Sequence, residues 1–175
     1  MDKKNKPKIT LFMAISLNGI IATENGDENF LSDENWDMFC KLAKEFGNFI
    51  YGRKTYEVVQ KWGNIDSFTD IQKVIISRKT IKLGKGYILA NSPEDAILKL
   101  SEKGFKKILV AGGANINSAF AKLNLFDEII LNVEPVIIGK GIPLFTPEDF
   151  ELKMKLISKE ISSSGILTLK YKVLK

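Results

Sequence analysis

Three short segments combine glycine, hydroxyl and positively charged residues in a way that suits phosphate binding. They are Gly52-Arg53-Lys54-Thr55, Ser77-Arg78-Lys79 and Gly112-Gly113-Ala114-Asn115. Glycine lets backbone N–H groups approach a ligand closely, and arginine donates two parallel hydrogen bonds to a phosphate. Each segment alone is as well explained by an ordinary surface turn. Together they predict a site for a nucleotide with more than one phosphate.

The chain contains no histidine among its 175 residues. This excludes Ser-His-Asp catalysis, Cys-His pairs and any metal site with a histidine ligand, and we predict no metal site. Acid–base chemistry then requires carboxylates, lysine, tyrosine or water. Asp33 and Glu134 are the candidate catalytic carboxylates. The alternatives are that Asp33 is only an acid in the first turn of a helix and that Glu134 is an exposed carboxylate on an edge strand.

The three segments each follow a short apolar run, at residues 48–51, 73–76 and 108–111. Runs without a polar break are typical of strands buried on both faces of a parallel sheet. In an open α/β sheet, ligands bind outside the carboxyl ends of the strands. If these strands are parallel, the three segments lie along one edge of the sheet and form one site.

The remaining pattern alternates strands and helices along a single domain, residues 1–175. Strands are predicted at 9–16, 20–22, 87–90 and 128–136, and helices at 32–46, 56–60, 92–105 and 114–123. This order favours an α/β fold with a mixed, mainly parallel sheet. Residues 151–161 and 166–174, joined by Ser162–Gly165, predict a C-terminal antiparallel hairpin on the sheet edge.

Composition narrows the setting of the protein. The net charge is +5, but no basic run is interleaved with aromatic residues, so we expect no nucleic-acid partner. Cys40 is the only cysteine, which suits a reducing cytoplasm. The charged first residues do not read as a signal peptide, and no run approaches the roughly 18 apolar residues that cross a membrane. We therefore expect a cytoplasmic protein without a membrane partner.

The order of several motifs resembles the dihydrofolate reductase-like fold, and in particular the C-terminal reductase domain of bifunctional riboflavin-biosynthesis deaminase/reductases. The motifs are Ser16–Ala22, Gly52–Glu57, Ala111–Ala114, Leu125–Glu128 and Pro135–Phe145. The resemblance covers nearly the whole chain. It implies three layers with helices on both faces of the sheet, a homodimer, and a cis peptide bond between Gly112 and Gly113. It also implies an NADPH-dependent reductase that transfers a hydride to a small heterocycle, either a pteridine or a riboflavin-pathway aminopyrimidine.

The resemblance also assigns roles to particular residues. Arg53 and Lys54 would meet the adenosine 2′-phosphate or the pyrophosphate, Thr55 the pyrophosphate, and Ser77 with Arg78 the 2′-phosphate side. Asn18 and Trp36 would contact the substrate. The full set implied for the cofactor is Ala14, Ala22, Gly52, Arg53, Lys54, Thr55, Ser77, Arg78, Ala111, Gly112, Gly113, Ala114, Asn115 and Ile116.

Two positions depart from the riboflavin reductases. Asn18 replaces an aspartate that these reductases usually carry, and Ala111 replaces an acid before the glycine pair. Both departures favour an alternative function, a nucleotide-binding module of the same fold without turnover. A purely structural subunit would follow only if the three segments were ordinary surface turns.

Overall fold

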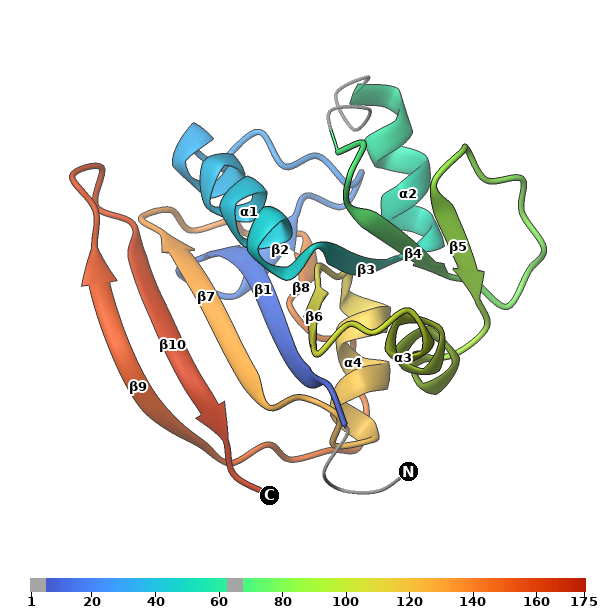
Figure 1. Ribbon diagram of the computed structural model, residues 1–175. Coiled ribbons are helices and arrows are strands. Elements are labelled where there is room, and N and C mark those ends of the chain that lie inside the picture. Colours follow the sequence, from blue (N-terminus) through green and yellow to red (C-terminus); the bar gives the residue numbers. More distant parts are fainter. Residues whose placement is uncertain (1–5, 63–67) are drawn as a thin grey trace.

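The computed structural model describes residues 6–62 and 68–175, and its centre is an eight-stranded sheet (Figure 1). The strands are β1 (Lys8–Ser16), β2 (Ile20–Ala22), β3 (Asn48–Gly52), β4 (Gln72–Ile76), β5 (Tyr87–Ala90), β6 (Lys107–Val110), β7 (Glu128–Glu134), β8 (Ile142–Pro143), β9 (Met154–Ile161) and β10 (Leu167–Val173). The helices are α1 (Asp33–Phe46), α2 (Arg53–Val59), the 3-10 helix η2 (Gln60–Trp62), α3 (Pro93–Glu102) and α4 (Ala114–Lys122).

The strand order in this sheet is β5-β4-β3-β6-β1-β7-β10-β9. Strands β1 and β3 to β7 are all parallel to one another, whereas β10 pairs antiparallel with both β7 and β9. β2 and β8 form a separate antiparallel pair. The prediction of a mixed, mainly parallel sheet with a C-terminal antiparallel hairpin on its edge is therefore confirmed.

Alternate residues of the central strands face two separate apolar layers, as the two-residue period of a strand requires. On one face, Leu11 and Val110 pack with α3 and α4. On the other, Phe12 and Leu109 pack with α1 and α2. The sheet thus lies between two helical layers, which confirms the predicted three-layer arrangement with helices on both faces.

The helix ends follow from local sequence. α1 starts after Ser32 with Asp33 and Glu34 in its first turn, where acidic residues favour the helix dipole. It ends at Gly47, which adopts a left-handed conformation with φ 68° and donates its N–H to the carbonyl of Ala43. At α3, the Ser92 hydroxyl accepts the N–H of Asp95 and Pro93 occupies the first turn.

Three boundaries differ from the sequence prediction. α2 begins at Arg53 rather than near Tyr56, because the extended Gly52 takes the N-cap position and the helix starts at once. β7 ends at Glu134, since Pro135 has no N–H to continue the ladder. β9 begins only at Met154. The loop that the sequence predicts from Trp62-Gly63-Asn64 lies, from residue 63 on, outside the described residues.

None of the helices within the described ranges is both long enough and apolar enough to cross a membrane.

Candidate functional site

The strands β4, β3 and β6 are parallel neighbours, so the three glycine- and cation-containing segments follow strands that end side by side. Two of the segments are in direct contact. The Gly52 N–H donates to the Gly112 carbonyl at 2.9 Å, and the Ala111 N–H donates to the Ile50 carbonyl at 2.8 Å. A Cβ atom built on Gly52 would lie 2.8 Å from Cγ1 of Ile116. Only glycine at position 52 permits this approach.

The Gly112–Gly113 peptide bond is cis, as the resemblance implied. Gly112 has φ +84°, in the left-handed region that side chains rarely adopt. Gly113 is the N-cap of α4, so the N–H groups of the first turn of that helix begin directly after it. A Cβ atom on Gly113 would lie 3.3 Å from the Thr55 hydroxyl. The two turns therefore enclose a narrow space lined by backbone and one hydroxyl.

The polar and charged residues of the segments after β3 and β4 differ in their hydrogen-bond partners. Arg53 donates from Nη1 to Oε1 of Glu57 at 2.6 Å, one helical turn along α2. The Ser77 hydroxyl closes its own turn, since it donates to the Lys79 carbonyl at 2.8 Å and accepts the Lys79 N–H at 3.0 Å. Lys54 and Arg78 are exposed. The edge is therefore positive at its surface, with Arg53 already in an ion pair.

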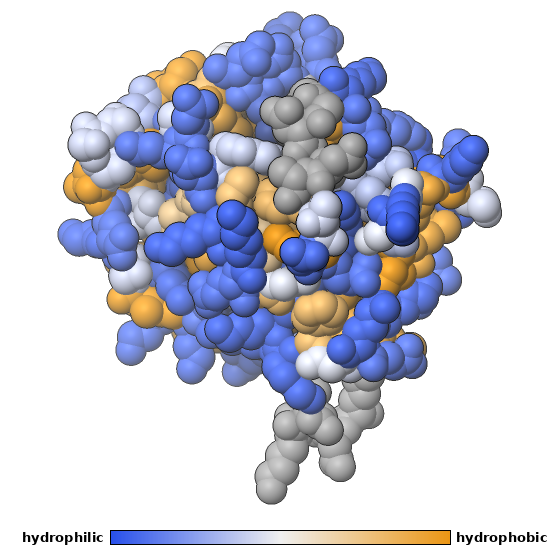
Figure 2. Space-filling view, turned by 45° about the horizontal axis from the view of Figure 1, so that its top comes forward, coloured by the Kyte–Doolittle hydropathy of each residue, from blue (hydrophilic) through white to orange (hydrophobic). Residues whose placement is uncertain are grey.

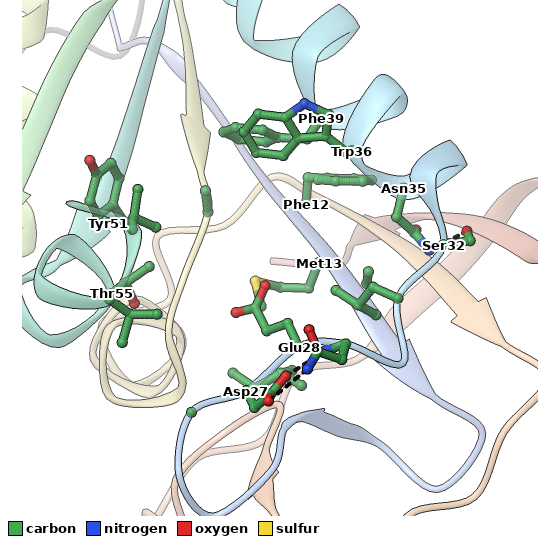
Figure 3. Close-up of a pocket in the computed structure, with 18 of the residues that line it drawn as sticks. Phe12, Met13, Asp27, Glu28, Ser32, Asn35, Trp36, Phe39, Tyr51 and Thr55 are labelled. Atoms are coloured by element: carbon green, nitrogen blue, oxygen red, sulfur yellow. Dashed lines mark hydrogen bonds between the residues drawn. The ribbon is translucent and has the colours of Figure 1, made fainter. Parts of the chain in front are cut away.

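A cleft of about 660 Å³ opens beside these turns and is lined by residues of α1 and α2. Five aromatic residues, Phe12, Trp36, Phe39, Phe49 and Tyr51, form part of its lining. Figure 3 labels four of them, Phe12, Trp36, Phe39 and Tyr51. The rings of Trp36 and Phe39 are 5.7 Å apart, and those of Phe39 and Phe49 are 5.2 Å apart. Figure 2 shows apolar residues exposed in small areas between hydrophilic residues on this face of the molecule. The cleft suits a flat, largely apolar ring system.

The loop between β2 and α1 adds two carboxylates to the cleft lining, Asp27 and Glu28. Asp27 accepts the N–H and the side-chain amide of Asn29, both at 2.8 Å. The Glu28 side chain is directed into the cleft beside Met13 (Figure 3). Burial, and next the charge of Asp27, raise the pKa of Glu28 from 4.5 to about 7. Glu28 is thus an acid that titrates near neutral pH.

A buried polar network lies behind the cleft and holds the start of α1. Glu134 on β7 accepts the Ser32 N–H at 2.8 Å and also the side-chain amide of Asn35. The Asn35 carbonyl oxygen accepts from Asn132 at 2.7 Å, and the Asn132 oxygen accepts from Thr168 at 2.8 Å. Because every member is hydrogen-bonded, the network fixes the orientation of Asn35, which lines the cleft.

The structure brings some of the predicted site residues into the cleft lining and distributes the others around it. The cleft is lined by Ala14, Asp33, Trp36, Thr55 and Ala111. Gly52, Arg53, Lys54, Gly112, Gly113, Ala114, Asn115 and Ile116 belong to the two touching turns, and Ser77 and Arg78 follow the neighbouring strand β4.

The remaining three predicted residues lie neither in the cleft lining nor in the three segments after β3, β4 and β6. Ala22 is on β2, where its carbonyl is near Gly141. Asn18 joins two loops, since it accepts from the Ser16 hydroxyl at 2.8 Å and donates to the Ile138 carbonyl at 2.8 Å. Glu134 lies in the buried network.

Sequence reasoning missed Glu28 and Asn35. Asn35 could have been found, because it lies four residues before Phe39 and so shares the buried face of α1 with it. A polar residue on an apolar helix face indicates a buried partner or a ligand. Glu28 lies in an irregular loop with no periodicity, and no sequence signal could have placed its side chain.

The chain belongs to the family described as the RibD C-terminal domain, whose model matches residues 7–168. The uncharacterized protein YyaP of Bacillus subtilis is 25% identical over 179 residues, with 94% of each chain covered. The family is one of reductases, so its membership supports a reductase role for this chain.

Solved structures agree with this assignment. A protein of Shewanella sp. PV-4, assigned provisionally to riboflavin biosynthesis, has a TM-score of 0.82 at 25% identity and covers 96% of this chain and 99% of its own. A dihydrofolate reductase of Enterococcus faecalis, complexed with NADP(H), has a TM-score of 0.76 at 12% identity, with 97% and 98% covered. The fold is therefore dihydrofolate reductase-like.

The raised pKa of Glu28 predicts a pH-dependent stability. Between pH 4.5 and about pH 7, the folded chain keeps a proton on Glu28 that the unfolded chain releases. The free energy of unfolding should therefore fall as the pH rises through this window, by up to about 3 kcal/mol. Glu28→Gln should remove this dependence of the unfolding free energy on pH, whereas the exposed loop variant Glu24→Gln should keep it. Urea unfolding at pH 5 and pH 8 measures the change in unfolding free energy between the two pH values. The same change in Glu28→Gln and in the unmutated protein would contradict the prediction.

Proposed function

We propose that this protein is an NADPH-dependent reductase that transfers a hydride to a small heterocycle of the pteridine or riboflavin-pathway aminopyrimidine type. The observation that carries the proposal is the meeting of two glycine turns with an aromatic cleft at the carboxyl ends of parallel strands. A dinucleotide needs both a phosphate-binding backbone and a pocket for a ring, and these features adjoin here.

The turns fit the phosphates of such a cofactor. A small space separates Thr55 from the backbone of Gly113. A Cβ atom on Gly113 would lie 3.3 Å from the Thr55 hydroxyl and would partly fill that space. The first N–H groups of α4 suit an anion, because helix N-termini carry unsatisfied donors and a partial positive charge. Ala14 and Ala111 are small residues of the cleft lining that would leave room for the nicotinamide end. Ala22 on β2 and Ile116 beside Gly52 are outside this lining, and their contact with the cofactor rests on the resemblance alone.

The cationic edge favours NADPH over NADH. Arg53, Lys54 and Arg78 lie on adjacent segments, and a 2′-phosphate is the group by which the two cofactors differ. Ser77 would act by shaping the turn that carries Arg78, because its hydroxyl is bonded within that turn.

The cleft residues would then hold and orient the substrate. Trp36 and Phe39 provide flat surfaces for a heterocycle, and Asn35 keeps one fixed orientation through Glu134 and Asn132. NADPH, when bound, supplies the hydride, so the chain needs no nucleophile of its own. Its residues orient the two rings and exclude water. Of the two carboxylates implied for catalysis, Asp33 is exposed in the cleft lining and Glu134 is buried behind Asn35.

A nucleotide-binding module without turnover is the second candidate. The observation that favours it concerns Asn18, whose amide is used to join the loop after β1 to Ile138 instead of lining the cleft. An increase in melting temperature with NADPH, without NADPH oxidation in the presence of pteridines or aminopyrimidines, would support a binder. Oxidation with one of these substrates would establish the reductase.

We further propose that residues 1–175 act as one domain, in the cytoplasm, as a homodimer. β9 is one of the two edge strands of the sheet and is exposed along its whole length. Exposed apolar residues on this strand are Met154, Leu156, Ile157 and Ile161, which is unusual for an unpaired edge.

Light scattering at micromolar concentration should give twice the chain mass, and Ile157→Lys should reduce the measured mass. A monomeric unmutated protein would contradict the dimer.

Cofactor preference tests the cationic edge. NADPH should bind more tightly than NADH, and Arg53→Ala should weaken NADPH by about 1–3 kcal/mol, roughly 5- to 150-fold in Kd. Glu57→Gln removes the ion-pair partner of Arg53 and should leave NADPH binding equal or tighter. Calorimetric titration with both cofactors measures these values. Equal Kd values for NADPH and NADH would refute the 2′-phosphate assignment.

The two glycines of the second turn should respond differently to alanine. Gly113 has an ordinary φ of −77°, so Gly113→Ala should fold with little loss of stability but lose NADPH affinity, because the methyl group enters the space beside Thr55. Gly112→Ala is the matched control. It combines φ +84° with a Cβ 2.9 Å from the Met13 sulfur, and should lose about 1–2 kcal/mol of stability or more. Unchanged NADPH affinity in Gly113→Ala would exclude the proposed phosphate position.

A further inference from the structure

Reduction of a heterocycle needs a proton as well as a hydride, and the cleft offers few groups that can supply it. Its lining contains five titratable side chains, which are those of Asp27, Glu28, Asp33, Tyr51 and Lys61. The donor must face the ring that occupies the cleft, and it must carry a proton near neutral pH while giving it up readily.

Four of these groups fit that requirement poorly. Asp27 is bound on both oxygens by Asn29 and is exposed. Asp33 is exposed in the first turn of α1, and Lys61 is an exposed cation on η2. The Tyr51 hydroxyl is on the far side of its ring from Glu28 in Figure 3. Burial, and then the neighbouring tyrosines, raise the pKa of Tyr51 above its usual range, so it holds its proton firmly.

Glu28 meets the requirement in both geometry and charge. It is half-buried, and its side chain is directed into the cleft beside Met13 (Figure 3). Among the described residues, no hydrogen-bond donor contacts its carboxyl group, so the group is available to a ligand. The same burial and the charge of Asp27 that raise its pKa to about 7 leave it about half protonated at neutral pH.

We propose that Glu28 is the proton donor of this cleft and that its acceptor is a ring nitrogen of an uncharged heterocycle with a reducible C=N bond. This assignment rests on the proposed reductase function. The acceptor carbon gains a C–H bond with the electron pair that comes as hydride from the dihydronicotinamide, which is oxidised. The adjacent nitrogen uses the former C=N π electrons to bond the proton of Glu28. Glu28 is left as a carboxylate and is reprotonated by water.

The charges around Glu28 support an uncharged substrate. Asp27 lies on the same loop, Asp33 on α1 and Lys61 on η2, and the lining of α2 and of β1 that faces the cleft contributes no charge. Three carboxyl groups against one lysine disfavour a phosphorylated ring at this position. The rate of reduction should fall as the pH rises through about 7, because the protonated form of Glu28 is then lost.

The test combines a titration with a kinetic measurement. Carbon-detected NMR of the side-chain carboxyls, assigned with Glu28→Gln, should give a Glu28 pKa near 7, and Asp27→Asn should lower it. With NADPH and 7,8-dihydropterin, Glu28→Gln should lower kcat by about 100-fold or more and lose the pH dependence near 7. Its Kd for NADPH should remain within about twofold of the unmutated value, and Glu24→Gln should behave as unmutated protein.

Each contrary result counts against a definite part of the proposal. A Glu28 pKa near 4.5, or a Glu28→Gln protein with unchanged rate and pH profile, would overturn the donor role. An unmutated protein that binds NADPH but does not reduce 7,8-dihydropterin would overturn the C=N substrate. Failure of the unmutated protein to bind NADPH would overturn the proposed function itself, which the calorimetric Kd reports separately from the carboxyl titration.

Discussion

The contact between the turns after β3 and β6 is the constraint on which the rest of the site depends. The Gly52 N–H bonds to the Gly112 carbonyl at 2.9 Å, and a Cβ atom on residue 52 would lie only 2.8 Å from Cγ1 of Ile116. Because of this approach, α2 and α4 begin side by side at one edge of the sheet. A larger residue at position 52 would push the starts of α2 and α4 apart and so change the space between them.

The opposite side of the cleft is fixed by a different interaction, the buried carboxylate of Glu134. Its hydrogen bonds from the Ser32 N–H and the Asn35 amide attach the first turn of α1 to β7. A buried carboxylate is tolerated when donors surround it, and here those donors belong to the helix that forms the cleft wall. The cleft therefore lies between the two touching turns and the start of α1, and each of these is held by its own hydrogen bonds. The loop that carries Glu28 leads into α1.

The sequence predicted the features that arise from local pattern. The apolar runs at 48–51, 73–76 and 108–111 identified strands whose carboxyl ends do lie together, and the hairpin formed by 151–161 and 166–174 does lie at an edge of the sheet. What escaped prediction depends on contacts between distant segments. The partners of Glu134, about a hundred residues away, and the direction of the Glu28 side chain follow only from tertiary packing.

In the proposed complex, a phosphorylated dinucleotide lies across the two touching turns with its ring end in the aromatic cleft. Backbone amide NMR during titration with NADPH tests it most directly, since each residue reports separately. The account predicts the largest shifts at Gly52, Thr55, Gly113 and Asn115, smaller shifts at Ala14 and Trp36, and none along β9. Shifts confined to other surfaces, or no shifts at the glycine turns under saturating NADPH, would contradict it.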